Sequence, residues 1–268
     1  MKTVQKDFSS HKDLVTFALQ NLCVSVKNNG ADVGAIKGGR EEALKALKDI
    51  KPKDYVSTRN FIDGAVTWLS PYIRHGILTL EDVRQEALTH VDTPEKIEKF
   101  IQELAWREFW QRLYVQQPDY IWNNIEDYKT GLSHDDYADE LQEDIRKGET
   151  PVACLNHFIG NLINDGYVHN HARMYLASYV VHFRRVKWQA GAQWFLTHLL
   201  DGDPASNNLS WQWVASTFSN KPYIFNLDNV RKYATDDIDT SSENNEVLDY
   251  SYDELNERLF PKKGQINA

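Results

Sequence analysis

Residues 201–213 bring together side chains that could bind a ligand and take part in chemistry: two carboxylates, two asparagine amides, a turn glycine and two indoles. The opening Asp-Gly-Asp-Pro predicts a turn, because glycine tolerates positive φ and proline presets its own φ. The Asp, Ser and Asn side chains are suited to cap a following helix. Two large aromatic residues beside a polar cluster favour a pocket with one polar and one flat apolar wall, and hence a planar ligand. By spacing alone, an ordinary capped core helix explains the segment equally well.

Two further groups of residues suggest function, each with a plain structural alternative. Glu103 and Trp106 lie three positions apart on a predicted long helix and therefore share a face. A surface Glu beside an interface Trp fits that spacing slightly better. Ser70-Pro71 predicts a helix start, with Ser70 as its N-cap, whose free amides could hold a phosphate. Most capped helices, however, bind nothing.

Metal sites and the common nucleotide motifs are not indicated. His169 and His171 are two positions apart, so they face apart on a helix, and no third residue has convincing ligand spacing. The sequence therefore predicts no metal. Neither a GxGxxG motif nor a Walker loop is present, so a nucleotide cofactor would have to bind in another way.

The elements that must position these residues are predicted to be helices throughout. Apolar residues recur at helical spacing in segments separated by Gly, Pro and Asn turns, and no run alternates as a strand would. The predicted fold class is therefore all-α. The expected helices are residues 12–26, 40–50, 80–88, 93–113, 151–162, 172–186 and 193–200.

The composition, 41% hydrophobic and 26% charged over 268 residues, is typical of a soluble globular protein. No run approaches the roughly 18 apolar residues of a membrane span, and the first residues lack the apolar region of a secretory signal. Cys23 and Cys154 are too few for a disulfide framework, and Cys154 lies in an apolar helical run that favours a buried thiol. We therefore expect a cytoplasmic protein with no membrane partner.

The net charge of −9 is unevenly distributed. From Ala234 onward, nine acidic residues accompany three basic ones. The low hydrophobicity of this segment predicts an acidic flexible tail over residues 234–268, or a segment that depends on a partner, with one possible helix at residues 252–259. The overall charge mildly disfavours nucleic acid as the main partner, but the less charged body still allows a local basic groove.

Six stretches, taken in order, resemble one family. They are residues 38–44 (GGREEAL), 55–59 (YVSTR), 69–73 (LSPYI), 103–109 (ELAWREF), 166–174 (GYVHNHARM) and 201–213. Together they are similar to the FAD-binding catalytic domain of DNA photolyases and cryptochromes. The resemblance covers about residues 34–233 and leaves residues 1–33 as an N-terminal helical extension. The family's N-terminal α/β antenna domain has no counterpart, so a stand-alone FAD domain is expected.

The resemblance implies that FAD binds in a U shape inside a helical bowl. Asp201 would pair with Arg173, Asp203 would reach the polar edge of the flavin ring, and the side chain opposite N5 would tune the ring's redox state. The residues that match the family's cofactor contacts are Tyr55, Thr67, Leu69 and Ser70 for the phosphates and ribitol, Asn170, Arg173, Asp201 and Asp203 for the ring, and Asn207 for N5.

The same resemblance implies light-driven electron transfer. Trp211 and Trp188 match the first two members of the tryptophan chain that photoreduces the flavin, and Trp122 or Tyr128 is a candidate for the third. Plain core packing is the alternative for both indoles.

The resemblance also implies a pocket for a flipped pyrimidine dimer, which needs flat apolar walls, a polar contact and cations to hold the DNA strand. The matching residues are Glu103, Trp106, Met174 and Trp213 for the pocket, and Arg59 and Arg107 for the DNA phosphates. Other cations are missing. His171 and Trp68 stand where arginine is usual, and residues 220–226 lack the family's arginine. Each lost cation would reduce by roughly one the slope of the logarithm of the DNA-binding constant against the logarithm of salt concentration. Losing three would therefore remove a large share of the DNA affinity.

We therefore expect an FAD-binding, photolyase- or cryptochrome-like protein that uses blue light for flavin electron transfer. In its enzymatic form it would be a deoxyribodipyrimidine photolyase that repairs cyclobutane pyrimidine dimers in damaged DNA. The alternative is a cryptochrome-like photoreceptor or an interaction protein, with weak or no repair, that acts through a protein partner or a homo-oligomer. The retained Glu103, Trp106 and Trp213 favour the enzyme, whereas the lost arginines and the acidic tail favour the alternative.

Overall fold

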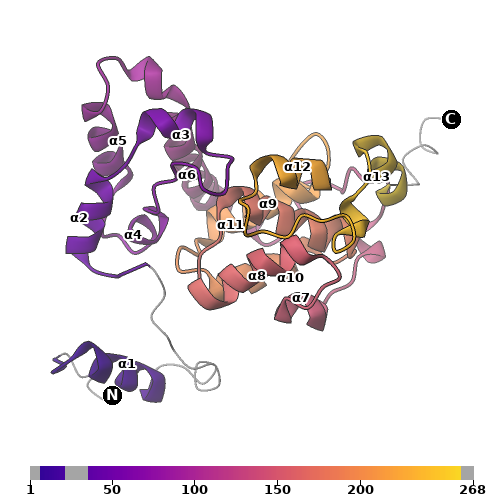
Figure 1. The fold of residues 1–268 in the computed structure, drawn as a ribbon, viewed down its shortest axis with the longest axis horizontal. Coiled ribbons are helices and arrows are strands. Elements are labelled where there is room, and N and C mark those ends of the chain that lie inside the picture. The colour runs from indigo at the N-terminus through magenta and orange to yellow at the C-terminus, as the bar shows by residue number, and fades with distance from the viewer. Residues whose placement is uncertain (1–6, 22–35, 261–268) are drawn as a thin grey trace. The chain divides into compact units, whose positions relative to one another are not determined.

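The computed structural model describes residues 7–21 and 36–260, and within these ranges it contains helices and no strand (Figure 1). The chain divides into two compact units, Met1–Lys37 and Gly38–Ala268. The first unit contains α1 (His11–Asn21), where the Phe8 and Phe17 rings pack with centroids 5.3 Å apart. Residues 22–26 of the predicted first helix, Cys23 and the end of the predicted N-terminal extension lie outside the described residues.

The second unit is built from helices joined by turns and short loops. Its α-helices are α2 (Arg40–Lys48), α3 (Pro52–Thr58), α4 (Ser70–Arg74), α5 (Leu80–Thr89), α6 (Glu98–Gln116), α7 (Glu143–Lys147), α8 (Ala153–Asp165), α9 (Asn170–Ser178), α10 (Trp188–His198), α11 (Pro204–Ala215), α12 (Leu227–Tyr233) and α13 (Tyr252–Leu259). Single-turn elements are η2 (Pro94–Ile97), η3 (Pro118–Ile121), η4 (His134–Asp136), the π-helix η5 (Tyr179–Phe183) and η6 (Glu246–Leu248). The predicted all-α fold is confirmed. None of the described helices combines the length and apolar character needed to cross a bilayer.

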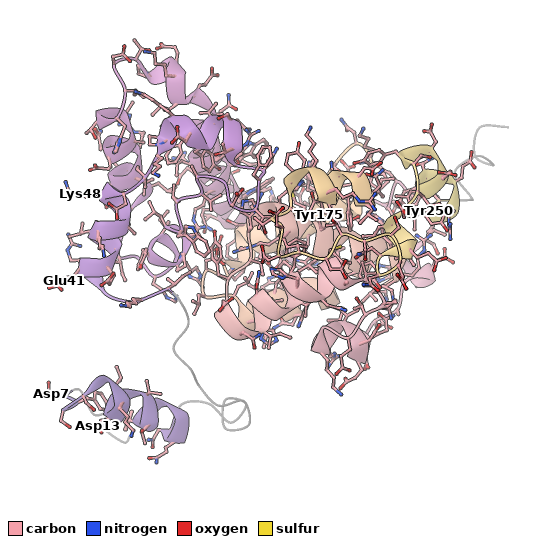
Figure 2. The ribbon with its side chains drawn as sticks, in the orientation of Figure 1. Asp7, Asp13, Glu41, Lys48, Tyr175 and Tyr250 are labelled. Atoms are coloured by element: carbon pink, nitrogen blue, oxygen red, sulfur yellow. The ribbon has the colours of Figure 1, made fainter. Side chains whose placement is uncertain are left out.

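The core of the second unit lies around α11, which contacts α6, α9, α10 and η3. Its largest fully buried side chains include Trp188, Tyr175, Phe158 and Phe195; Tyr175 is labelled among the helices in Figure 2. Burying an aromatic side chain of this size contributes on the order of 4 kcal/mol before the entropy cost of ordering it. These side chains share one core cluster with Trp211 of α11.

Two predicted helices have different limits in the structure. The helix expected at 172–186 is α9 followed by the π-helix η5, and α10 begins at Trp188 instead of residue 193. Residues 179–182 are all buried, so no one-sided periodicity marks the transition. Gly191 weakens the helical pattern of the first turn of α10, yet glycine is required there. A Cβ at Gly191 would lie 2.2 Å from Cη2 of Trp211.

The prediction of a flexible tail from Ala234 is wrong for the described part of that segment. Leu248 is 0% exposed, Leu255 1% and Phe260 2%. A capping box starts α13, with the Ser251 hydroxyl accepting from the Glu254 backbone and the Glu254 carboxylate accepting from Ser251. The possible helix at residues 252–259 is confirmed as α13. The acidic composition of the segment predicted flexibility, but its few apolar residues bury one face of this short helix.

We predict that Leu255→Ala lowers the free energy of unfolding by about 2–5 kcal/mol, because it leaves a cavity where α13 packs. Val247→Ala is the matched control: its side chain is 37% exposed, so its effect should stay within about 0.5 kcal/mol. Urea denaturation of both variants measures the difference. Two equally small effects would show that α13 does not pack on the unit.

Candidate functional site

Two nearly buried carboxylates lie in the turn that precedes α11. Asp201 is 6% exposed and Asp203 is 7% exposed. Asp203 is the N-cap of α11, where its Oδ2 accepts a hydrogen bond from the Ser206 backbone at 2.9 Å and Pro204 occupies the first helical position. The turn and the cap that the sequence predicts are therefore confirmed.

Side chains from three other helices hold this turn. Arg173 on α9 donates from Nη2 to Asp201 Oδ2 at 2.9 Å, which is the pairing implied by the resemblance. Arg74, at the end of α4, donates from Nε to the Gly202 carbonyl at 2.6 Å. Gln111 on α6 donates to Asp203 Oδ2 at 2.6 Å. The turn at residues 201–203 therefore joins α4, α6 and α9 to the start of α11.

Arg107 on α6 belongs to the same cluster. Burial lowers the pKa of its guanidinium, and the charges of Asp203 and Asp201 oppose that shift. Burial would raise the pKa of Asp203, but hydrogen bonds from Ser206 and Gln111, together with the charge of Arg107, hold it below its ordinary value. Asp203 is thus ionised at neutral pH. Arg107, which the resemblance assigns to DNA phosphates, is half-buried, and its charge interacts with the two inner carboxylates.

Two acceptor atoms of the cluster have no donor among the described residues. Asp201 Oδ1 is buried and accepts no hydrogen bond. Asn207 donates from Nδ2 to the Ala192 carbonyl at 3.0 Å and to Asn208 Oδ1 at 2.9 Å, which leaves its own Oδ1 available. An unsatisfied buried acceptor costs about 1–3 kcal/mol. A planar ligand with an N–H at its edge would remove that cost.

The two indoles of α11 face opposite ways, with Trp211 2% exposed and Trp213 42% exposed. Trp211 lies against Gly191 of α10, and its ring packs edge-on against Phe195 with centroids 4.9 Å apart. The Trp213 ring instead packs loosely on Tyr223, with centroids 5.7 Å apart. Trp211 thus lies in the core, and Trp213 is available to solvent.

Trp188 is fully buried as the first residue of α10, one turn before the glycine that contacts Trp211. Its Nε1 donates to Asn124 Oδ1 at 2.7 Å. Tyr128 lies beside the Trp188 backbone and stacks on Tyr137, with ring centroids 4.2 Å apart. Trp122 is 47% exposed. The two candidates for a third electron carrier therefore differ, since one is buried and the other is at the surface.

The predicted substrate-side residues of α6 lie at the surface. Trp106 is 49% exposed and stacks on Trp110, with centroids 5.2 Å apart. Glu103 pairs with Lys99 Nζ at 2.8 Å and lies 4.0 Å from Arg59 Nε. The α6 surface therefore presents an exposed carboxylate next to a flat aromatic wall. This carboxylate already engages the two nearby cations, Lys99 and Arg59.

The start of α9 carries a dense polar group. Asn170 Nδ2 contacts Met174 Sδ at 3.9 Å. His169 caps the helix by accepting from the His171 backbone at 3.1 Å, and burial lowers its pKa to about 4. His171 donates from Nδ1 to the Asn60 carbonyl at 2.8 Å, and burial lowers its pKa as well. His171 therefore brings no positive charge to the position where an arginine is usual. No group of three or more His, Cys, Asp or Glu among residues 7–21 and 36–260 is arranged to hold a metal.

The predicted anion site at Ser70 differs from the structure. The N-cap of α4 is Leu69, without a side-chain cap bond, and Ser70 is the first helical residue. The backbone turns sharply at Trp68, where φ is 58°, so helical geometry begins one residue early. Thr67 Oγ1 accepts from the Leu69 backbone at 3.4 Å. Tyr55, on α3, packs on Phe100 of α6, and burial raises the pKa of its hydroxyl. A five-residue helix also has a weak dipole.

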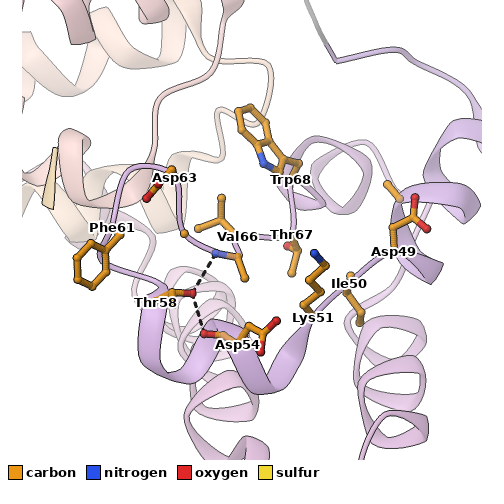
Figure 3. A pocket seen from close by; sticks show the side chains of 13 residues that line it. Asp49, Ile50, Lys51, Asp54, Thr58, Phe61, Asp63, Val66, Thr67 and Trp68 are labelled. Atoms are coloured by element: carbon orange, nitrogen blue, oxygen red, sulfur yellow. Dashed lines mark hydrogen bonds between the residues drawn. The ribbon is translucent and has the colours of Figure 1, made fainter. Parts of the chain in front are cut away.

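A cavity of about 780 Å³ opens beside this segment (Figure 3). Figure 3 shows the Trp68 ring on one side of it and Asp54 on the other. The Trp68 ring also stacks on Tyr167, with centroids 4.3 Å apart. Of the predicted cofactor-binding residues, Thr67 lines this cavity, whereas those assigned to the flavin ring do not. The cavity is therefore distinct from the carboxylate cluster.

Comparisons with known proteins agree with this geometry. A family model described as the FAD binding domain of DNA photolyase matches residues 100–243. The deoxyribodipyrimidine photo-lyase of Alkalihalophilus pseudofirmus is 33% identical over 75% of this chain and 43% of its own length, and that of Streptomyces griseus is 32% identical over 73% and 42%. This chain therefore spans less than half the length of these curated relatives.

Solved structures show the same helical arrangement. A Synechocystis cryptochrome aligns with a TM-score of 0.65 and 26% identity over 75% of this chain and 44% of its own. An archaeal photolyase from Sulfolobus tokodaii, solved with two FAD molecules, aligns with a TM-score of 0.63 and 26% identity over 82% of this chain and 47% of its own. The fold is thus that of the FAD-binding region in both proteins.

We predict that Asp203→Asn, which keeps a capping side chain and removes the charge, destabilises the protein at neutral pH. Because the pKa of Asp203 is lowered by folding, its contribution is fully present above the unfolded value of about 4 and is lost as pH falls through the folded value. The stability difference between wild type and variant should therefore be constant at neutral pH and shrink below about pH 4. Urea denaturation of the FAD-free protein across this range measures it, with the exposed Asp135→Asn as control. A difference that did not depend on pH would contradict the ionised pairing.

The residues of the cluster fit FAD. The free acceptors Asp201 Oδ1 and Asn207 Oδ1 suit the N–H-bearing edge of a flavin ring, and Arg173 and Arg107 balance the two carboxylates. When bound, FAD supplies a blue-light chromophore that exchanges single electrons. FAD is therefore the cofactor of this chain, which belongs to the family of FAD-binding domains of DNA photolyases.

Proposed function

We propose that this protein uses blue light absorbed by FAD to drive single-electron transfer through Trp211 and Trp188. The observation that carries the proposal is the burial of both indoles on consecutive helices, with Trp188 0% and Trp211 2% exposed. Trp188 lies one turn before Gly191, whose Cα faces the Trp211 ring. An electron can therefore pass between the indoles without crossing water.

Asn207 of the cofactor cluster and Trp211 lie on one helix, α11. Asn207 and Trp211 are four positions apart on α11 and thus share a face. A ring held opposite Asn207 is consequently next to Trp211. The hydrogen bond from Asn207 to the Ala192 carbonyl further fixes α11 against α10. This arrangement supports the assignment of Trp211 as the first electron donor.

Photoreduction should be lost in Trp211→Phe and strongly slowed in Trp188→Phe, because phenylalanine is far harder to oxidise than indole. Trp194→Phe is the matched control, since Trp194 lies on α10, is 8% exposed and packs on the Phe195 and His198 rings. The measurement is the bleaching of bound flavin under blue light, without oxygen and with an added thiol. If Trp211→Phe bleached at the wild-type rate, the proposed donor would be wrong.

A second candidate function is the repair of cyclobutane pyrimidine dimers in DNA, which the surface of α6 favours. Trp106 stacked on Trp110 offers a flat apolar wall, and Glu103 offers a carboxylate one turn away. The relatives described above are named as deoxyribodipyrimidine photo-lyases. Few cations are free to bind DNA, however, because Arg107 is half-buried and Glu103 engages Arg59. We therefore expect weak, strongly salt-dependent DNA binding.

For this second function, Glu103→Gln should weaken repair of a dimer-containing oligonucleotide by about tenfold or more, the value of a hydrogen bond to a charged group. Glu108→Gln is the control, because Glu108 is an exposed residue of the same helix paired with Arg112. Repair is measured at low salt with prereduced protein under blue light. Absence of repair by the wild-type protein would remove the DNA function and leave flavin photoreduction standing.

A further inference from the structure

The two buried indoles differ in the surroundings of their N–H groups. Trp188 Nε1 donates to Asn124 Oδ1 at 2.7 Å. Trp211 Nε1 is also buried, but it has no hydrogen-bond partner among the described residues. The amide oxygen of Asn124 is therefore a polar group that contacts one indole and has no counterpart at the other.

The loop that carries Asn124 is held firmly against α10 and α11. Its neighbour Ile125 donates from the backbone to Gln212 Oε1 on α11 at 3.0 Å. Gln189, next to Trp188, donates from Nε2 to the same Asn124 Oδ1 at 3.3 Å. These contacts fix the carbonyl dipole of Asn124 before any electron moves.

Loss of an electron leaves a positive charge on an indole and makes its N–H a stronger donor. Hydrogen bonds from charged donors are roughly twice as strong as neutral ones. The Asn124 oxygen therefore stabilises oxidised Trp188 more than neutral Trp188. Trp211, which lacks such an acceptor, gains nothing comparable. The positive charge is consequently more stable on Trp188 than on Trp211.

We propose that Asn124 is a positioning residue that directs electron transfer from Trp188 to Trp211 and so prevents charge recombination. This inference rests on the proposed photoreduction. Trp211 gives one electron to the excited oxidised flavin, and Trp188 then gives one electron to Trp211, which becomes neutral again. The positive charge stays on Trp188 with its Nε1 proton, because an amide oxygen is too weak a base to remove it. An added thiol finally returns an electron to Trp188.

Three variants test the proposal by transient absorption after a blue flash in the FAD-loaded protein. Asn124→Leu keeps the size of the side chain and removes the acceptor, so the yield of long-lived tryptophan radical should fall about tenfold. Asn124→Asp keeps the acceptor and adds a base, so the yield should persist and the radical should show the spectrum of the deprotonated, neutral form. Asn226→Leu is the control. Asn226 donates from Nδ2 to the Tyr250 carbonyl, so its replacement should leave the radical yield at the wild-type level.

Nuclear magnetic resonance of the FAD-free protein gives an independent readout. The indole N–H of Trp188 should resonate at lower field than that of Trp211, and Asn124→Leu should move only the Trp188 signal upfield. An unchanged radical yield in Asn124→Leu, or an unshifted Trp188 signal, would overturn the inference. In that case the proposed function would still stand if Trp211→Phe abolished photoreduction. If Trp211→Phe, in an otherwise wild-type protein, left photoreduction unchanged, the proposed function itself would be overturned.

Discussion

The burial of two carboxylates in one turn is the constraint on which the rest of this structure depends. Ionised groups are costly to bury unless they are paired and hydrogen-bonded. Asp201 and Asp203 are only 6% and 7% exposed, so the chain must bring compensating groups to them from elsewhere. Arg173, Gln111 and Arg107 serve that purpose. Because the two carboxylates need these partners, α6 and α9 pack against the start of α11.

This compensation is incomplete in a way that suits a ligand. One oxygen of Asp201 still lacks a donor among the described residues, and the available oxygen of Asn207 lies one helical turn from Trp211. The same helix therefore presents acceptors to the cofactor at its start and an oxidisable ring one turn later. Close contact between α10 and α11 at Gly191 then brings Trp188 into the path. Cofactor recognition and electron supply thus both depend on how α11 packs against α10.

Local patterns allowed much of the fold to be predicted from sequence. Turn chemistry predicted the cap at Asp203, and helical periodicity predicted the all-α class, because both depend on residues close together in the chain. Resemblance to a family added the pairing of Arg173 with Asp201. The burial of Arg107 and the effect of Asp201 and Asp203 on its pKa were missed, because these carboxylates lie almost one hundred positions away in the chain. The helix at residues 252–259 was expected as a possibility, but its packing was missed because the acidic composition of the segment indicated a flexible tail. Asn124 was missed because an isolated loop asparagine has no distinctive pattern.

The central claim is that FAD binds beside Trp211 and that Trp211 supplies an electron to it in the light. The most direct measurement is the fluorescence lifetime of flavin as FAD is titrated into the FAD-free protein. Electron transfer from a neighbouring indole competes with emission, so bound flavin should show a lifetime far shorter than free FAD, and Trp211→Phe should lengthen it. Bound flavin with the same lifetime in the wild type and in Trp211→Phe would contradict the account.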